Sequence, residues 1–188
     1  MAPYDDTGHL HPGPAWVAPY IYDGNGDLIW SGVSLFERFK IWDFRVAKFN
    51  GTDMLTGISH VDDGGKIINN EYELARTLRW TPSWNLTNRH EFNVIENGSR
   101  ALALTKEEFK KLSAAESKIA GHDGECKVNA QGLIELDITV DPPKTLFEWK
   151  AIDHIGLNET TFETANCTNN WDIQYVLFQL YEEDCSWR

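Results

Sequence analysis

The residues of this chain best suited to chemistry are two histidines that adjoin stretches typical of β-strands. His90 opens the run His90-Glu91-Phe92, which leads into an apolar stretch. Because side chains alternate along a strand, His90 and Phe92 would share one face and Glu91 would take the other. An imidazole at a strand end that faces a channel can act as a nucleophile or as a general acid or base. The competing interpretation is a hydrogen-bonded structural histidine.

The second candidate, His154, follows Asp153 directly and comes soon after Glu148-Trp149. A carboxylate beside an imidazole can raise its basicity. However, consecutive residues of an extended chain point to opposite faces, so Asp153 and His154 would not meet. A structural role is therefore favoured, and His154 is the lesser catalytic candidate.

One segment resembles the opening of a calcium-binding loop, with Asp23, Asn25 and Asp27 at the right spacing. The expected glycine is replaced by Leu28, and Ser34 stands where the bidentate glutamate belongs. The same residues have strong turn chemistry, so we interpret them as the turn of a hairpin. The sequence contains no Gly-rich phosphate loop, no G-x-S-x-G and no H-E-x-x-H. We therefore expect neither a metal nor a cofactor.

Charge and composition disfavour several classes of protein. The formal net charge is −12, whereas a nucleic-acid-binding surface needs clustered Lys and Arg. The same charge disfavours an anionic membrane surface, and no apolar run is long enough for a transmembrane helix. Aromatic residues make up 12% of the chain and include eight Trp, which favours strands because such side chains suit half-buried pleated surfaces.

One feature is typical of a protein made for the secretory pathway. The chain contains five Asn-x-Ser/Thr motifs, which are glycan acceptors if exposed in the lumen; their asparagines are Asn50, Asn85, Asn97, Asn158 and Asn166. The N-terminal residues lack the features of a signal peptide. The three cysteines, Cys126, Cys167 and Cys185, fit no zinc module, and they indicate either one disulfide with a spare thiol or no disulfide.

The elements that must hold the candidate side chains are short strands joined by tight turns. We expect strands at residues 17–22, 28–30, 41–49, 54–59, 66–70, 72–80, 92–95, 101–104, 133–140 and 146–149. One helical insertion is expected over 105–119, because Thr105 and Glu108 have the spacing of a capping box. Hairpins without βαβ alternation predict an all-β fold, either a propeller or a sandwich.

Five segments, none of them specific alone, follow one another in a set order over residues 16–174. They contain Pro19-Tyr20-Ile21-Tyr22-Asp23 with Leu28-Ile29-Trp30-Ser31-Gly32, Phe44-Arg45-Val46 with Asn50-Gly51-Thr52, His90-Glu91-Phe92-Asn93-Val94, Phe147-Glu148-Trp149-Lys150 with Asp153-His154-Ile155, and Trp171-Asp172-Ile173-Gln174. In this order they resemble the fungal branch of the arylsulfotransferase family.

The resemblance implies a secreted β-propeller that transfers sulfate from a phenolic ester to a phenol without a nucleotide donor. A central histidine of the family is thought to become a transient sulfohistidine, and donors around the channel hold the sulfate oxygens. His90 matches the family's His-Glu-Phe motif. His154 also matches a family position, to which no role is assigned.

The chain departs from the family pattern after Gln174, because Tyr175 and Leu177 stand where the family has His and Asn. We therefore expect an irregular lead-in over 1–15, a partial propeller over 16–174 and an unrelated tail over 175–188. Such a truncated propeller would expose strand edges and could self-associate. The alternative function is a non-catalytic propeller-type binding fragment or a gene remnant.

Overall fold

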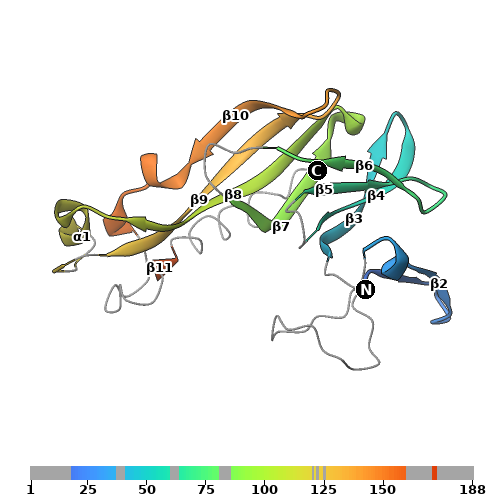
Figure 1. Cartoon of the computed structure of the whole chain (residues 1–188), viewed down its shortest axis with the longest axis horizontal. Coiled ribbons are helices and arrows are strands. Elements are labelled where there is room, and N and C mark those ends of the chain that lie inside the picture. Colours follow the sequence, from blue (N-terminus) through green and yellow to red (C-terminus); the bar gives the residue numbers. More distant parts are fainter. Residues whose placement is uncertain are drawn as a thin grey trace. The chain divides into compact units, whose positions relative to one another are not determined.

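The computed structural model describes residues 18–36, 41–59, 64–80, 86–119, 121, 123–124, 126–159 and 171–172 (Figure 1). These residues form antiparallel sheets with a single short α-helix, which confirms the all-β fold expected from the sequence. The expected lead-in over 1–15 and the tail over 175–188 lie outside the described residues. The strands are β1 (Tyr20–Tyr22), β2 (Leu28–Ser31), β3 (Ile41–Phe49), β4 (Thr52–Ser59), β5 (Gly65–Ile68), β6 (Leu74–Leu78), β7 (Leu86–Ile95), β8 (Arg100–Lys111), β9 (Lys127–Asp137), β10 (Lys144–Lys150) and β11 (Trp171–Asp172).

The strands pair in the order in which they occur along the chain. β1 and β2 form a two-stranded sheet, and β3-β4-β5-β6 form a four-stranded one. β7-β8-β9-β10 form a second run of four, and β11 pairs with β9 in parallel. Short turns thus join most neighbouring strands, which is the arrangement that a hairpin-rich sequence favours.

The chain divides into two compact units. Unit one contains Met1–Trp80, Arg89–Ala103 and Glu135–Leu146, and unit two contains Thr81–Asn88, Leu104–Ile134 and Phe147–Arg188. The strands β7, β8, β9 and β10 contribute residues to both units. His90 therefore belongs to unit one and His154 to unit two.

In unit one, a core of branched aliphatic and aromatic side chains fixes the sheet of β3 to β6. Ile58, Ile68 and Leu78 are fully buried. Phe92 is also fully buried and stacks on Trp80, with 5.7 Å between the ring centroids. Gly65 allows this close packing, because a Cβ at that position would lie only 2.6 Å from the Phe92 ring.

Two hairpins of unit one have the same turn, although their sequences share little. In the β1–β2 turn, the Asp23 carboxylate accepts the N–H groups of Asn25 and Asp27, each at 2.9 Å. In the β5–β6 turn, Asn69 Oδ1 accepts the N–H groups of Glu71 and Glu73 at 3.0 and 2.8 Å. The strand register also agrees, because Ile21 pairs with Trp30 as Ile67 pairs with Arg76.

A second similarity, in sequence alone, links β3 and β7, which begin the four-stranded and the five-stranded sheet. Trp42-Asp43-Phe44-Arg45-Val46 in β3 corresponds to His90-Glu91-Phe92-Asn93-Val94 in β7. The two turns are 46 residues apart in the sequence, and the two strand segments are 48 residues apart. Only Phe and Val are identical between the two strands, so the correspondence was not visible as a sequence repeat.

The helix begins later than the sequence predicts. Residues 105–111 belong to strand β8, and α1 extends over Ala114–Ile119. The expected capping box of Thr105 with Glu108 is therefore wrong. The actual box is Ser113 with Glu116: the Ser113 N–H donates to Glu116 Oε2 at 2.7 Å, and the Glu116 N–H donates to Ser113 Oγ at 3.2 Å.

Unit two has a small core of its own. Leu112, Cys126 and Val128 are buried together, with Ile152 and Leu157 packed against them. The Leu112 N–H donates to the Cys126 carbonyl at 2.9 Å. Cys126 is half of a disulfide, and the two other cysteines, Cys167 and Cys185, lie outside the described residues. Within the described part of the chain, no helix has the length and apolar character needed to cross a membrane.

Candidate active site around His90

His90 lies near the middle of β7, and its side chain is exposed. Its imidazole contacts the indole of Trp42 in an edge-on arrangement, with 5.3 Å between the ring centroids and 67° between the planes. Two residues further along, Phe92 anchors β7 in the core of unit one. The buried Phe92 thus holds β7 in place, while His90 on the same strand remains accessible to solvent. A nucleophile or proton carrier must be accessible in this way.

The strand that carries Trp42 is distorted directly beside this contact. The register between β3 and β4 shifts between Trp42 and Arg45. Asp43, in the middle of the shift, has a φ of 52°, a left-handed conformation that is uncommon for a residue with a side chain. Such bulges redirect side chains and concentrate near functional sites.

The Asp43 carboxylate is largely shielded from solvent and has three donors around it. It is 10% exposed. Its Oδ1 accepts Arg45 Nε at 2.8 Å and also Arg45 Nη2, and its Oδ2 accepts the main-chain N–H of Phe92 at 2.6 Å. A charged acceptor strengthens each of these hydrogen bonds. Asp43 therefore joins β3 to the segment of β7 that holds His90.

Glu91 adds a second carboxyl group to the cluster. Burial raises the pKa of Glu91 above its ordinary value, and the negative charge of Asp43 raises it further, while Arg45 opposes both effects. A carboxyl group with a raised pKa keeps its proton to a higher pH than usual. The site thus combines an exposed imidazole, a guanidinium paired with Asp43, and two carboxyl groups in different electrostatic environments, a composition suited to proton transfer.

His154 lies in unit two, in a different environment. It follows the turn η3 (Ala151–Asp153), and its N–H donates to the Ala151 carbonyl at 3.0 Å. Its imidazole is stacked in parallel on Trp149, with 5.3 Å between centroids and 5° between planes. This stacking is compatible with the expected structural role of His154, which stays a prediction.

Two of the glycosylation candidates lie together in unit one. Asn50 and Asn97 are both exposed. The Asn50 N–H donates to the Asn97 carbonyl at 3.0 Å, and the Gly51 N–H donates to Asn97 Oδ1 at 2.8 Å. Asn85 and Asn166 lie outside the described residues, and the side chain of Asn158 is likewise not described.

The calcium-like segment serves as a turn. The Asp23 carboxylate is committed to main-chain N–H groups, and these bonds, that of Asp27 first, lower the pKa of Asp23. Among the described residues, no group of three or more His, Cys, Asp or Glu side chains could hold a metal ion.

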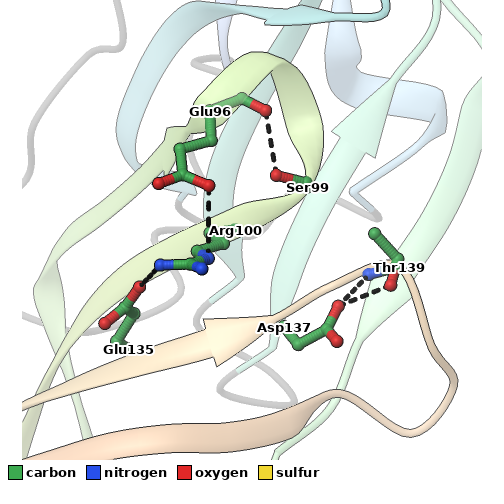
Figure 2. A network of polar contacts seen from close by, with 6 residues as sticks. All are labelled: Glu96, Ser99, Arg100, Glu135, Asp137 and Thr139. Atoms are coloured by element: carbon green, nitrogen blue, oxygen red, sulfur yellow. Dashed lines mark hydrogen bonds and ion pairs between the residues drawn. The ribbon is translucent and has the colours of Figure 1, made fainter.

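A separate polar network links β8 to β9 on the surface of unit one (Figure 2). Arg100 Nη1 donates to Glu135 Oε1 at 2.7 Å, and Arg100 Nε lies 3.2 Å from Glu96 Oε2. Asp137 Oδ1 accepts the N–H of Thr139 at 2.9 Å as well as its hydroxyl. The Thr139 side chain lowers the pKa of Asp137 most, followed by the Thr139 N–H. These partly or fully exposed contacts join neighbouring strands, and each carboxylate is already engaged by a partner within the network.

Comparison with known proteins gives no independent family assignment. No family model, no curated protein and no solved structure matches the chain. The arylsulfotransferase resemblance therefore depends only on the segments quoted from the sequence.

Sequence reasoning identified His90 but missed the residues around it. Trp42, Asp43 and Arg45 come from β3, which is separated from β7 by three strands. No local sequence pattern indicates that these residues lie beside His90, because the contact depends on how β3 and β7 pack.

Proposed function

We propose that this chain is an arylsulfotransferase-like protein in which His90 carries the sulfo group from a phenolic sulfate donor to a phenol acceptor. The observation that supports this best is the exposed His90 imidazole beside Trp42, next to the cluster of Asp43, Arg45 and Glu91. The aromatic ring offers a surface for an aryl group.

The proposed reaction proceeds in two displacements. An unprotonated nitrogen of His90 attacks the sulfur of the aryl sulfate, the S–O bond to the aryl group breaks, and the phenolate leaves with the electron pair and is protonated by water. In the second step the acceptor oxygen attacks the same sulfur and loses its proton to water. The S–N bond then breaks, and its electron pair returns to the imidazole.

The two internal repeats support a propeller architecture for this protein. Hairpins with equal turns and register occur at Asp23 and Asn69, and corresponding first strands carry Trp42 and His90. Sheets of four sequential antiparallel strands are the units from which propellers are built. A propeller would bring equivalent first strands around one channel, which is where a transfer site with several donors could be assembled.

Secretion belongs to the same proposal. Asn50 and Asn97 are exposed, as glycan acceptors must be. Cys126 is half of a disulfide, and disulfides persist in oxidising compartments. Both features support an extracellular location.

Self-association through strand edges is also part of the proposal. The two-stranded sheet β1–β2 carries three half-exposed apolar side chains, those of Tyr22, Leu28 and Ile29. Such an apolar surface favours contact with another chain. Light scattering during size-exclusion chromatography would detect it as a mass above that of one chain.

The experiment uses the purified full chain with a chromogenic aryl sulfate and a phenol acceptor. We expect release of the donor phenol together with formation of the acceptor sulfate. His90→Ala should lower kcat/KM by about a thousandfold or more, since the nucleophile is lost. Lys48→Ala is the control, because Lys48 is exposed and pairs only with the exposed Asp53 in the described contacts.

Two results would contradict this proposal. Turnover that survives His90→Ala but disappears in His154→Ala would move the chemistry to unit two. A folded chain with no turnover on any aryl sulfate tested would favour the non-catalytic binding fragment or the gene remnant.

A further inference from the structure

Asp43 has an unusual combination of backbone and side-chain environment. Its φ of 52° is in the left-handed region, which a residue with a Cβ adopts less readily than glycine. Its carboxylate is 10% exposed and accepts donors from two different strands. Glycine would adopt this backbone conformation with less strain. Aspartate is therefore present at this position because of the contacts that its side chain makes.

The bonds of Asp43 connect two strands that belong to different sheets. β3 is an edge of the β3–β6 sheet, and β7 is an edge of the β7–β10 sheet, so no sheet pairing joins them. The N–H of Phe92 donates to Asp43 Oδ2 at 2.6 Å. Within a sheet, the main-chain N–H of Phe92 would donate to a carbonyl of a neighbouring strand. Here the Asp43 carboxylate accepts that N–H instead.

The same residue determines where Trp42 and His90 meet. Trp42 precedes Asp43 directly, and Phe92 follows His90 by two positions. Fixing Asp43 to the Phe92 N–H therefore fixes the two chain segments that carry the Trp42–His90 ring contact. Arg45 donates to Oδ1 from the other side and holds the carboxylate in this orientation.

We propose that Asp43 is the positioning residue of the His90 site: through the Phe92 N–H it holds the imidazole against Trp42, while Arg45 orients the carboxylate. The claim that Asp43 affects catalysis rests on the proposed function. The claim that Asp43 fixes the position of the His90 imidazole is independent of that function. Supporting groups of this kind commonly change activity about 10–100-fold when they are replaced.

The test replaces Asp43 with Asn in the full chain. Asparagine keeps the shape but has one oxygen, so it cannot accept both Arg45 and the Phe92 N–H as the carboxylate does. The matched control is Asp53→Asn, which removes an exposed carboxylate from the Lys48 pair on β4. Asp43→Gly is a second variant, because glycine relieves the left-handed backbone and is expected to fold even if Asp43→Asn does not.

Two readouts are measured on each variant. The first is the NMR titration of the His90 ring protons, which does not require the protein to be active. The charged groups near this imidazole are Asp43, Arg45 and Glu91. The second is the separation of kcat from KM with an aryl sulfate donor. Both Asp43 variants should move the His90 resonances and their titration midpoint, and they should lower kcat about 10–100-fold with KM changed less than about threefold.

The outcomes separate the two proposals. Asp43→Asn or Asp43→Gly chains that fold and leave the His90 titration unchanged would overturn the positioning role. A shifted titration in a chain without any transferase activity would support the positioning role and contradict the proposed function. A titration that moves equally in Asp53→Asn would show that the response is not specific to Asp43 and would also overturn the proposal.

Discussion

The imidazole of His90 meets the indole of Trp42 edge-on, with 5.3 Å between the two ring centroids. Trp42 lies in β3 and His90 in β7, which begin the four-stranded and the five-stranded sheet. Their contact defines the geometry on which the proposed chemistry depends.

The first prediction concerns this contact. Trp42→Ala should lower kcat for aryl sulfate transfer by about tenfold, because an edge-on aromatic contact of about 1 kcal/mol is lost and the imidazole is less well held. Trp42→Phe should retain most of the rate, since an aromatic face remains. Steady-state kinetics of the three proteins checks this. Equal kcat in the wild type and in Trp42→Ala would show that the ring does not position His90.

The second prediction uses the equal turns at Asp23 and Asn69. Asn69→Ala should lower the free energy of unfolding by about 1 kcal/mol, since two N–H groups lose their acceptor. Asn69→Asp should cost less, because an aspartate already performs this role at position 23. Urea unfolding at neutral pH measures both. If Asn69→Ala and Asn69→Asp were equally destabilised, the turns would not be equivalent.

The pH dependence of the two variants provides a further check on the turn. The N–H donors lower the pKa of Asp23 in the folded state, and an aspartate at position 69 should behave likewise. A lowered carboxyl pKa contributes stability that is present above the unfolded pKa and is lost as the pH falls through the folded value. Asn69→Asp should therefore lose stability relative to the wild type below about pH 4.

The third prediction concerns Glu91. Its pKa is raised by burial and by Asp43, so the ionised form is less favourable in the folded than in the unfolded state, and folding is weakened as the pH rises through the folded value. Glu91→Gln should therefore raise Tm at pH 7 by about 1–3 °C, a modest gain because the group is partly exposed. The gain should be smaller at pH 4, because a larger share of the Glu91 side chain is then protonated and neutral, as glutamine is. Scanning calorimetry at the two pH values tests this, and a gain that is larger at pH 4 would contradict the sign.

The fourth prediction concerns Gly65, which packs against the anchor of the His90 strand. Gly65→Ala should destabilise the protein by about 1–3 kcal/mol, because the new Cβ would lie 2.6 Å from the Phe92 ring. Gly24→Ala is the control, since a Cβ there meets nothing within 4 Å, and we expect a change below about 0.5 kcal/mol. Denaturant midpoints of both variants provide the comparison. Equal midpoints would mean that Phe92 can move without cost.

Much of the fold could be predicted from local pattern. Turn residues such as Asp23 and Asn50-Gly51 mark hairpins, and the strands follow from apolar residues between them. The helix was placed too early because Thr105 and Glu108 have the same spacing as Ser113 and Glu116. Pairing with β7 and β9 keeps residue 105 in a long strand, and tertiary pairing of this kind overrides a local capping signal.

The surroundings of the site could not be predicted in the same way. His90 could be predicted as a candidate from the sequence because the chemistry of an imidazole depends on a single residue type, which is visible at a single position. The role of Asp43 depends on a left-handed backbone and on a hydrogen bond to Phe92, which is distant in sequence. Neither feature leaves a mark in composition or in the alternation of side chains.

The most direct test of the central claim is to trap the sulfo group on the protein. The full chain is mixed with an aryl sulfate in the absence of acceptor, quenched at alkaline pH to preserve the S–N bond, digested and examined by mass spectrometry. We predict that the peptide containing His90 gains the mass of one sulfo group, that the gain disappears when a phenol acceptor is added before the quench, and that His90→Ala shows no gain. Donor turnover that proceeds with the peptide of His90 unmodified, or with the sulfo group on another residue, would contradict the assignment of His90 as the nucleophile.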